Sequence, residues 1–461
     1  MMAHHISMLQ DKKKKILLIT YHFPPSSAIG GVRIASFTKY LPNEGWEPIV
    51  LTIQDSYVEH KDEALLDLLP PVAIYKTRLL PSINELYLKI KSLISKNWPA
   101  RTCSDAISSH SNNNTFTKQS NQLKSIRNFI VALMAVPDEK RNWIIPATIK
   151  ALHIIRREKI HYCLTSSPPY STHIIGLLIK LIRKQTKWIA DFRDPWMVPL
   201  DKRLYPTTFF SKAIDYCLEN NVIRKADLVL TTTKLLADEL SGYYRKYHSS
   251  KFIVVPNGFE SEVCAFVDTR CYDIFTISYT GSFYVGRSPE PIFQAVSSLI
   301  KSKTISASDI RIKLVGNCRY IESIPTEEII KKYDLVSVVE VIDPVPQTEA
   351  HRIIRQSHIS LLLAPNQPYQ IPAKTYEYIG LGTPILALTG EGATADLINS
   401  TEFGKAIHPD NIDSIKAYLI KEMNQKDSQK DQNVASLDIY TRRRSVQQLV
   451  QHINELEAEK P

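Results

Sequence analysis

The stretch KILLITYHFPPSSAIGGVRIASFTKYL, residues 15–41, carries the pattern on which the fold prediction rests. Its apolar run at 15–20 predicts a buried strand, and helical periodicity resumes at 34–41. The loop between them contains two prolines and the pair Gly30 and Gly31, and it matches no standard nucleotide-binding fingerprint. Glycines there would let backbone N–H groups approach a phosphate or a sugar. A tight turn that needs glycine geometry is the alternative.

The strand-then-helix pattern recurs along the chain in two sets. Further strands are expected at 47–52, 161–166, 187–192, 227–232 and 251–256, and then at 275–281, 311–316, 335–342, 359–364 and 384–390. Helical stretches such as 147–157 and 172–184 lie between them. Buried strands separated by helices indicate parallel sheets covered on both faces. We therefore expect an α/β protein of two doubly wound, Rossmann-like domains, 1–258 and 259–461, facing a central cleft. The last helix is a candidate to pack back on the first domain.

Composition narrows the class of protein. The chain has 461 residues, of which 44% are apolar and 23% charged, as in ordinary globular proteins of two or three domains. Its six cysteines include no C-x-x-C pair, which argues against a disulfide framework or a zinc site and favours the reducing cytosol. No apolar run reaches the roughly 18 residues of a membrane-spanning helix. The basic N-terminus lacks the apolar region of a signal peptide.

The net charge of +10 favours an anionic partner, either a phosphorylated substrate or a membrane surface. Nucleic acid is not expected, because no nucleic-acid-binding motif accompanies the charge. Surplus surface lysine is the alternative explanation.

Two segments interrupt the alternation of strands and helices. Residues 101–122 are polar and rich in Ser and Asn, which predicts a flexible insert. Residues 123–137 predict either a membrane-surface helix or a helix packed on the domain.

The most informative segment in the second half is PAKTYEYIGLGTP, residues 372–384, between two expected strands. Pro372 suits the first turn of a helix that carries Glu377. A carboxylate near the start of such a helix can accept both hydroxyls of a ribose, and the helix N-terminus offers N–H groups to a diphosphate. Glu377 could equally be a solvated helix residue.

This segment resembles the nucleotide-sugar motif of the family 4, or group 1, glycosyltransferases, which have the GT-B fold. In that motif a glutamate precedes a small, glycine-containing turn and a strand, and Glu377, Gly382 and Pro384 stand at the matching spacing. The family usually has another glutamate eight residues earlier that contacts the transferred sugar. This chain has Tyr369 at that position. The resemblance covers residues 15–110 and 135–450, and its strength lies in the shared order of several weak motifs.

The resemblance also implies a set of donor-binding residues. Gly281 and Ser282 fall in the first strand–loop–helix segment of the second domain, and Arg287 would reach the donor diphosphate. Arginine pairs with two phosphate oxygens at once and stays charged. A solvent-exposed loop arginine is the alternative. Lys374 would add charge at the diphosphate, and the backbone at Val345 would contact the base.

In the first domain the segment DFRDPW, residues 191–196, stands at a strand end, where doubly wound sheets bind ligands. Asp191 and Asp194 are therefore candidate catalytic residues, with Asp194 preferred as the base that acts on the acceptor. Alternatively, either aspartate pairs with Arg193 to hold the loop. His173 begins the next helix and is the third candidate, although structural histidines are commoner there. With Gly30 and Gly31, Arg33 is expected to contact the donor.

The resemblance implies a transferase that moves a sugar from a nucleotide-diphosphate sugar to a sugar or lipid-linked acceptor, in polysaccharide or glycolipid assembly. It further implies retention of the anomeric configuration. Neither a metal nor another cofactor is expected, because positive groups and N–H donors at the diphosphate would stabilise the leaving group and the sequence has no convincing acidic D-x-D site. A cytoplasmic protein with peripheral contact to the anionic inner face of the cell membrane fits this reading. Two alternatives stay open: a GT-B nucleotide-sugar 2-epimerase, and a catalytically silent, membrane-associated binding subunit. Tyr369 keeps the second alternative open.

Overall fold

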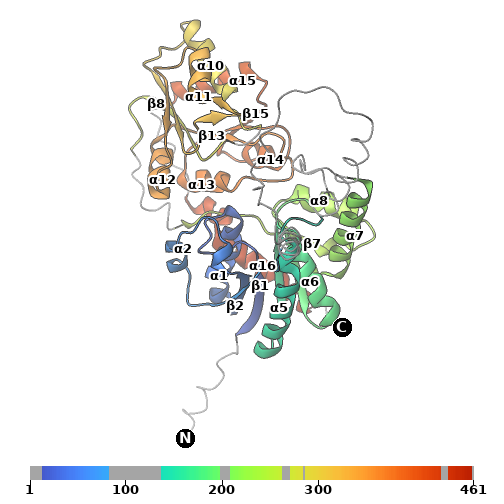
Figure 1. Cartoon of the computed structure of the whole chain (residues 1–461). Coiled ribbons are helices and arrows are strands. Elements are labelled where there is room, and N and C mark those ends of the chain that lie inside the picture. The colour runs from blue at the N-terminus through green and yellow to red at the C-terminus, as the bar shows by residue number, and fades with distance from the viewer. Residues whose placement is uncertain are drawn as a thin grey trace, which may run out of the picture. The chain divides into compact units, whose positions relative to one another are not determined.

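The computed structural model describes residues 13–81, 136–197, 208–261, 270–283, 286–426 and 434–458 (Figure 1). The chain divides into two compact units, Met1–Val229 and Leu230–Pro461. The chain passes from the first sheet to the second after the point that divides the two units. Strands up to Val254 belong to one sheet, and the next large sheet begins at Phe275. The expected segment 101–122, and residues 123–135 of the expected segment 123–137, lie outside the described residues.

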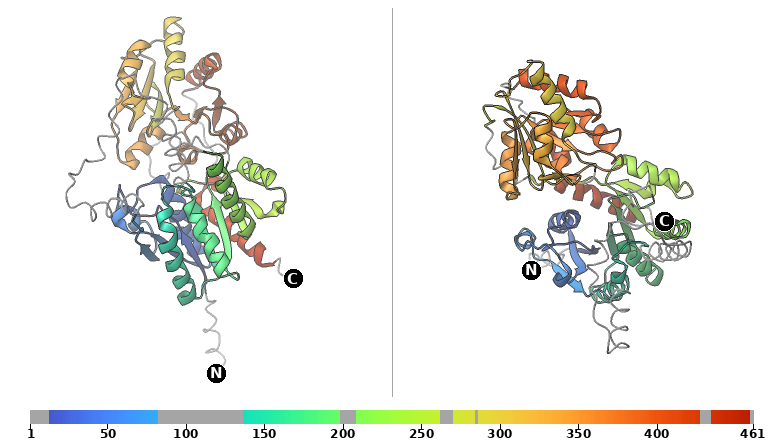
Figure 2. Two further views of the ribbon diagram at one scale, coloured as in Figure 1. Left: turned by 45° about the vertical axis from the view of Figure 1, so that its right-hand side comes forward. Right: turned by 45° about the horizontal axis from the view of Figure 1, so that its top comes forward.

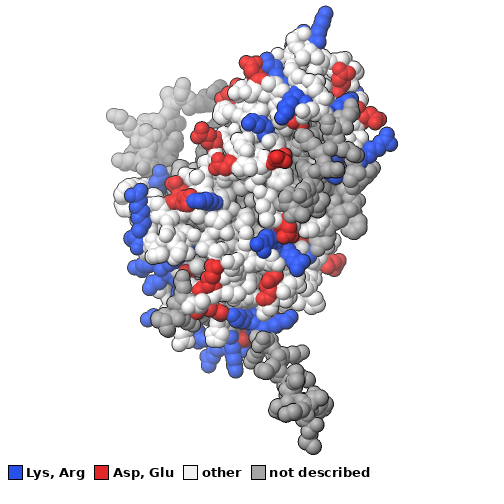
Figure 3. All heavy atoms as spheres, turned by 180° about the vertical axis from the view of Figure 1, so that it is seen from behind, with Lys and Arg blue, Asp and Glu red and all other residues white. Residues whose placement is uncertain are grey.

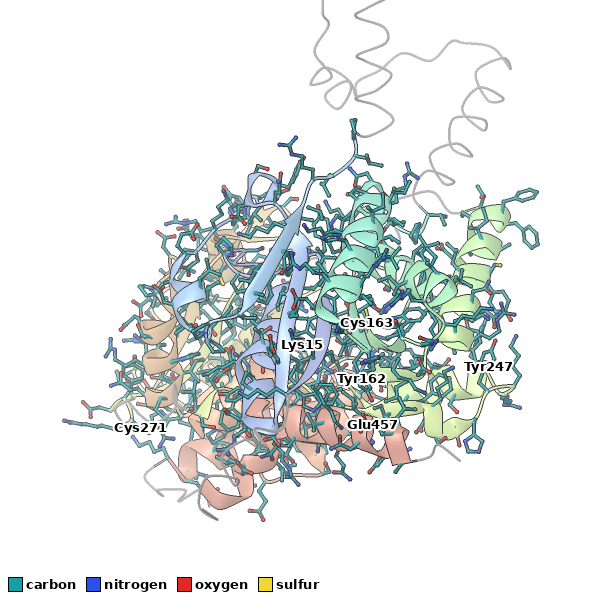
Figure 4. All side chains as sticks on the ribbon, turned by 90° about the horizontal axis from the view of Figure 1, so that it is seen from below. Lys15, Tyr162, Cys163, Tyr247, Cys271 and Glu457 are labelled. Carbon is teal, nitrogen blue, oxygen red and sulfur yellow. The ribbon has the colours of Figure 1, made fainter. Side chains whose placement is uncertain are left out.

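The N-terminal sheet has seven strands in the order β3-β2-β1-β4-β5-β6-β7. Its strands are β1 (Lys14–Ile19), β2 (Trp46–Ile53), β3 (Ala73–Thr77), β4 (Tyr162–Ser167), β5 (Lys187–Phe192), β6 (Leu228–Thr231) and β7 (Phe252–Val254). Neighbours from β3 to β5 are parallel, with Ile16 of β1 opposite Tyr162 of β4. Figure 4 shows Lys15 and Tyr162 on these two strands. The order reverses between β1 and β4, as the doubly wound prediction requires.

Helices accompany this sheet, and those at Ile144–Glu158 and Ser171–Ile182 present an apolar stripe to it. The helices are α1 (Val32–Tyr40), α2 (Ala64–Asp67), α5 (Ile144–Glu158), α6 (Ser171–Ile182), α7 (Phe209–Lys225) and α8 (Lys234–Tyr243), with short 3-10 turns at Ile29–Gly31, Leu41–Glu44, Asp55–Tyr57, Arg141–Trp143 and Ser249–Lys251. Helices α5 and α6 pack on each other, α5 against β1 and α6 against β4 (Figure 2). Ala147, Ala151 and Ile154 of α5 join Leu17 and Ile19 of β1 in one buried apolar cluster.

The C-terminal sheet has six strands in the order β12-β9-β8-β13-β14-β15, all paired in parallel. Its strands are β8 (Phe275–Thr280), β9 (Ile310–Val315), β12 (Val339–Ile342), β13 (Ile359–Leu363), β14 (Ile385–Leu388) and β15 (Gly404–Ile407), beside a hairpin of β10 (Tyr320–Ile321) and β11 (Ile324–Pro325). The order reverses between β8 and β13. The accompanying helices are α10 (Glu290–Lys301), α11 (Thr326–Lys332), α12 (Gln347–Gln356), α13 (Ala373–Leu381), α14 (Ala393–Asn399), α15 (Ile412–Asn424) and, after a 3-10 segment at Val434–Tyr440, α16 (Arg442–Ala458).

The prediction of two doubly wound α/β domains is therefore confirmed, with local differences. Strands β3 and β15 were not expected. Both are short edge strands with several partly exposed residues, so no continuous apolar run marks them. The expected strand at 335–342 is shorter, because Leu335 and Val338 are buried in the turn before β12. The boundary at residue 258 stays a prediction.

The charge distribution, the cysteines and the hydropathy of the helices bear on the predictions made from composition. Basic and acidic side chains are mixed on the face that Figure 3 shows. Among the described cysteines no disulfide forms, with Cys163 and Cys318 buried and Cys217 and Cys271 exposed. None of the described helices has the length and apolar character needed to cross a bilayer.

Candidate functional site

In the N-terminal sheet, the carboxyl ends of β1 and β4 meet where the strand order reverses, which is where doubly wound sheets bind ligands. The loop after β1 holds Gly30 and Gly31. A Cβ at Gly30 would lie 3.0 Å from Cδ2 of His22, and one at Gly31 would lie 3.3 Å from the backbone oxygen of His22. The loop's own packing therefore disfavours side chains at both positions. This supports the tight-turn reading of the glycine pair.

Arg33 lies in α1, and its guanidinium is buried against Asp191 at the end of β5. Its Nε donates to Oδ1 and Oδ2 at 3.1 and 3.0 Å, and Nη2 donates to Oδ1 at 3.0 Å. The Ser166 hydroxyl donates to Oδ2 at 2.7 Å. Both charged side chains are almost fully buried, at 5% and 0% exposed. The structure thus brings two predicted site residues together as an internal ion pair, an arrangement that holds α1 on the sheet.

Arg193 follows β5 and connects the two loops that flank this site. Its guanidinium donates to the backbone oxygens of Gly30, Ser167 and Pro168 at 2.6 to 2.7 Å. Burial lowers the pKa of Arg193, and the carboxylates of Asp194 and Asp191 oppose that shift. Asp194 is partly exposed next to it. Of the predicted catalytic carboxylates, Asp194 is therefore the more accessible to a ligand.

His173, the third predicted catalytic residue, is completely buried at the start of α6. Its Nδ1 lies 2.8 Å from the hydroxyl of Thr165, which also accepts the indole N–H of Trp188. Burial lowers the pKa of His173 to about 3, so the ring is neutral near pH 7. No described residue bonds its Nε2. This environment is typical of a core histidine.

His22 was not singled out by the sequence analysis, although it lies in the quoted stretch. It follows β1 directly, beside Gly30, and is partly exposed. Burial, and then the charges of Arg193 and Lys140, lower its pKa to about 4. His22 is therefore a neutral imidazole at the point where the strand order reverses, able to accept a hydrogen bond. Its position shortly after a predicted buried strand could have marked His22 as a candidate site residue.

Asp138 lies in the segment VPDEKRNW, residues 136–143, and contacts a helix that is distant in the sequence. Its carboxylate accepts the Ser171 backbone N–H at 2.7 Å and the Ser171 hydroxyl at 2.6 Å. It also accepts the N–H of Lys140 at 2.8 Å. Asp138 thus caps α6 from a distant segment, and burial raises its pKa.

We expect Asp138→Ala to lower the free energy of unfolding by about 1–2 kcal/mol, as loss of a helix cap typically does. Urea unfolding followed by tryptophan fluorescence would measure the change. Glu139→Ala is the matched control, because Glu139 is exposed and adjacent. Equal stability of the two variants would show that the cap contributes nothing.

In the C-terminal sheet, the order reverses between β8 and β13, and Gly281 directly follows β8. Gly281 has φ +130°, and a Cβ there would lie 2.6 Å from Nζ of Lys374. That Nζ donates to the backbone oxygen of Thr280 at 2.7 Å and lies 4.4 Å from the centre of the Tyr279 ring. Burial, together with the positive charge of Arg287, lowers the pKa of Lys374 to about 8. Gly281 thus leaves room for a buried, titratable amine at the switch point.

Two other predicted donor-binding residues of this unit, Arg287 and Glu377, lie close enough to Lys374 to shift its pKa. The Arg287 guanidinium lies 3.4 Å from Oε1 of Gln367, and the Glu377 carboxylate lies near enough to Lys374 to oppose the shift of its pKa. Ser282 accepts the Tyr279 hydroxyl on its backbone oxygen at 2.8 Å. Val345 lies apart from them in sequence, in the loop that leads from β12 into α12.

Glu377 is on α13, four residues after its first residue, Ala373, and the helix begins directly after Pro372 as the sequence predicts. Its carboxylate is 30% exposed and lies 3.7 Å from Nε2 of His351 on α12. The sequence analysis did not identify His351. The site therefore combines two cations suited to a diphosphate with a carboxylate suited to hydroxyl groups. Among the described residues no group of three or more His, Cys, Asp or Glu side chains could hold a metal ion.

No protein-family model and no curated protein sequence matches the chain. Solved structures do match it over nearly its full length. A glycosyltransferase from Rickettsia africae aligns with 97% of this chain and 100% of its own, with a TM-score of 0.59 and 12% identity. HepE from Anabaena, in complex with UDP-glucose, aligns over 96% and 99%, with a TM-score of 0.58 and 11% identity. The chain has the GT-B fold.

The GT-B fold is shared by proteins of different activity. A UDP-N-acetylglucosamine 2-epimerase from Listeria monocytogenes matches 97% of this chain and 98% of its own, with a TM-score of 0.53 and 12% identity. At these identities the likeness concerns the fold, and the activity has to be argued from the site.

Proposed function

We propose that this GT-B protein is a glycosyltransferase that transfers a sugar from a nucleotide-diphosphate sugar to an acceptor in polysaccharide or glycolipid assembly. The observation that carries the proposal is the group formed by Lys374, Arg287 and Glu377 at the switch point of the C-terminal sheet. The UDP-glucose complex of HepE, a protein of the same fold, supports a uridine nucleotide as the first ligand to test.

In this proposal the C-terminal unit binds the donor. Lys374 and Arg287 bind the diphosphate, with the backbone of Gly281 and Ser282 beside them, and Glu377 accepts the ribose hydroxyls. The backbone at Val345 contacts the base. In transfer, the bond between the anomeric carbon and the β-phosphate oxygen breaks, and a bond to the acceptor oxygen forms. The acceptor hydroxyl loses its proton. The two cations stabilise the charge that develops on the leaving phosphate, so the proposal needs no metal.

The N-terminal unit would bind the acceptor at the reversal between β1 and β4. Asp194 is the proposed base for the acceptor hydroxyl, and His22 is the nearby neutral imidazole. Asp191, Arg33 and His173 would hold this site in shape rather than touch the sugar, because all three are buried. The proposal includes retention of the anomeric configuration, which the family resemblance implies. It also includes a cytoplasmic location, supported by the scattered cysteines, and contact with anionic lipid, supported by the net charge of +10.

The proposal is tested first by binding. Isothermal titration of the full chain with UDP should show saturable binding, and Glu377→Ala should weaken it roughly 10- to 100-fold, because hydrogen bonds to a charged group contribute about 1.5–3 kcal/mol. Glu402→Ala is the control. Glu402 is exposed and lies just before β15, the edge strand of the C-terminal sheet. Failure of the wild type to bind any nucleoside diphosphate would reject the proposal.

The 2-epimerase is the second candidate function, favoured by the likeness to the Listeria protein. Donor alone separates the two. A transferase should leave the nucleotide sugar unchanged or hydrolyse it slowly, whereas an epimerase should accumulate the isomeric nucleotide sugar, detectable by NMR. Isomerisation without acceptor would replace the transferase proposal. Tight binding without turnover on any acceptor would favour a binding subunit.

A further inference from the structure

His351 lies on the face of α12 that packs toward the core. The buried residues of this helix are His351, Ile353 and Ile354. Ile354 belongs to one apolar cluster with Tyr376 and Ile379 of α13. An apolar side chain would therefore be the ordinary choice at position 351.

His351 is only 6% exposed, and neither of its ring nitrogens has a hydrogen-bond partner among the described residues. Burying two unpaired polar atoms destabilises a protein relative to an apolar side chain of similar shape. The polar neighbour nearest to Nε2 is Oε2 of Glu377, at 3.7 Å. The carboxylate is 30% exposed and the imidazole side chain 8%, so the ring lies on the buried side of the carboxylate.

We propose that His351 is a positioning residue that gives Glu377 its selectivity for ribose hydroxyl groups. A separation of 3.7 Å is too long for a hydrogen bond, and a small rotation of either side chain closes it. When ribose orders the carboxylate, Nε2–H donates to Oε2 and fixes the plane of the carboxylate. Both hydroxyls then find their acceptors already in place, as donors behind metal-binding carboxylates achieve elsewhere. The inference rests on the proposed nucleotide site.

The test compares two ligands on the full chain, UDP and 2′,3′-dideoxy-UDP, by isothermal titration. The ratio of their dissociation constants measures recognition of the hydroxyls. For the wild type we expect UDP to bind roughly 10- to 100-fold more tightly, from hydrogen bonds to a charged acceptor. For His351→Phe we expect the ratio to fall below about threefold, with affinity for the dideoxy analogue unchanged.

His351→Gln is the matched rescue variant, because its amide N–H₂ can donate from nearly the position of Nε2. It should restore most of the wild-type ratio. His452→Phe on α16 is the control for replacing a histidine elsewhere in the same unit, and it should keep the ratio. The melting temperature of His351→Phe should equal or exceed that of the wild type, because the buried unpaired nitrogens are gone.

The outcomes separate this inference from the proposed function. If the wild type discriminates between the ligands and His351→Phe does so equally, His351 has no positioning role and the proposed nucleotide site stands. If the Gln variant behaves like the Phe variant, packing rather than donation explains the effect, and the inference is overturned. If wild-type protein binds both ligands equally, Glu377 does not take the ribose, and the site assignment fails together with the inference.

Discussion

Asp191→Ala is expected to lower the free energy of unfolding of the N-terminal unit by about 3–5 kcal/mol, the usual cost of removing one partner of a buried ion pair. Arg33 would keep its guanidinium at a site where its side chain is 5% exposed, without the carboxylate that accepts from its Nε and Nη2. The Ser166 hydroxyl would also lose its acceptor. No other single substitution considered for this chain removes so many buried polar contacts.

Tryptophan fluorescence in urea measures this effect selectively, because all five tryptophans of the chain fall within residues 46–196. Asp55→Ala is the matched control. It also breaks an ion pair of the N-terminal unit, with Lys76, but those two side chains are 41% and 30% exposed. Exposed pairs contribute little, so this control should unfold like the wild type. An Asp191→Ala variant as stable as that control would contradict the expectation.

The double variant Arg33→Met/Asp191→Leu should recover most of the lost stability, because apolar replacements of both partners remove the two buried charges together. It also separates a structural from a catalytic role. If the folded double variant keeps transfer activity, the pair only supports the site. If it binds the donor but transfers nothing, Asp191 has the catalytic role that the sequence suggested.

The sequence predicted the fold where burial leaves a continuous apolar run. Strands β1, β4 and β13 are buried along most or all of their length, and each was expected within one or two residues. Edge strands such as β15 are short and partly exposed, so their sequences lack a continuous apolar run and resemble those of loops. Helix α13 was predicted to begin near Pro372 because proline there agrees with the local backbone geometry.

From the sequence, polar residues at strand ends could be named as candidates for the two sites. Which of these side chains contact one another could not be predicted. Arg33 and Asp191 are 158 positions apart, and they meet because α1 lies over the sheet near the end of β5. The contact between Lys374 and the backbone of Thr280 could not be predicted for the same reason, because the two residues are far apart in the sequence. Side-chain partners across a sheet depend on packing that no local pattern contains. Asp138 and His351 were missed for this reason.

Lys374→Met is expected to weaken UDP binding roughly 10- to 100-fold at pH 7, the range for losing a charged hydrogen bond to phosphate. Lys374 has donors to spare, since a protonated amine has three N–H groups and only the Thr280 oxygen is a hydrogen-bond acceptor within the described site. Its pKa of about 8 means that it is mostly charged at pH 7. Burial disfavours that charge, and a bound diphosphate would favour it.

The pH dependence of binding provides the sharper measurement. A diphosphate should raise the pKa of Lys374, so the free protein binds fewer protons than the complex above pH 8. UDP affinity should therefore be steady below about pH 7.5 and fall as the pH rises through 8, approaching tenfold per unit by pH 9. Burial raises the pKa of the neighbouring Cys318 thiol to about 12, so it does not titrate in this window.

In Lys374→Met the affinity should be low and flat between pH 7 and 9, whereas the control Lys405→Met, exposed on β15, should keep the wild-type slope. Isothermal titration at several pH values measures both. A wild-type affinity that does not change between pH 7 and 9 would show that Lys374 is not a ligand of the diphosphate. A slope that persists in Lys374→Met would assign the titration to another group. Either result would leave Arg287 as the principal cation of the site, because its charge persists over the whole range.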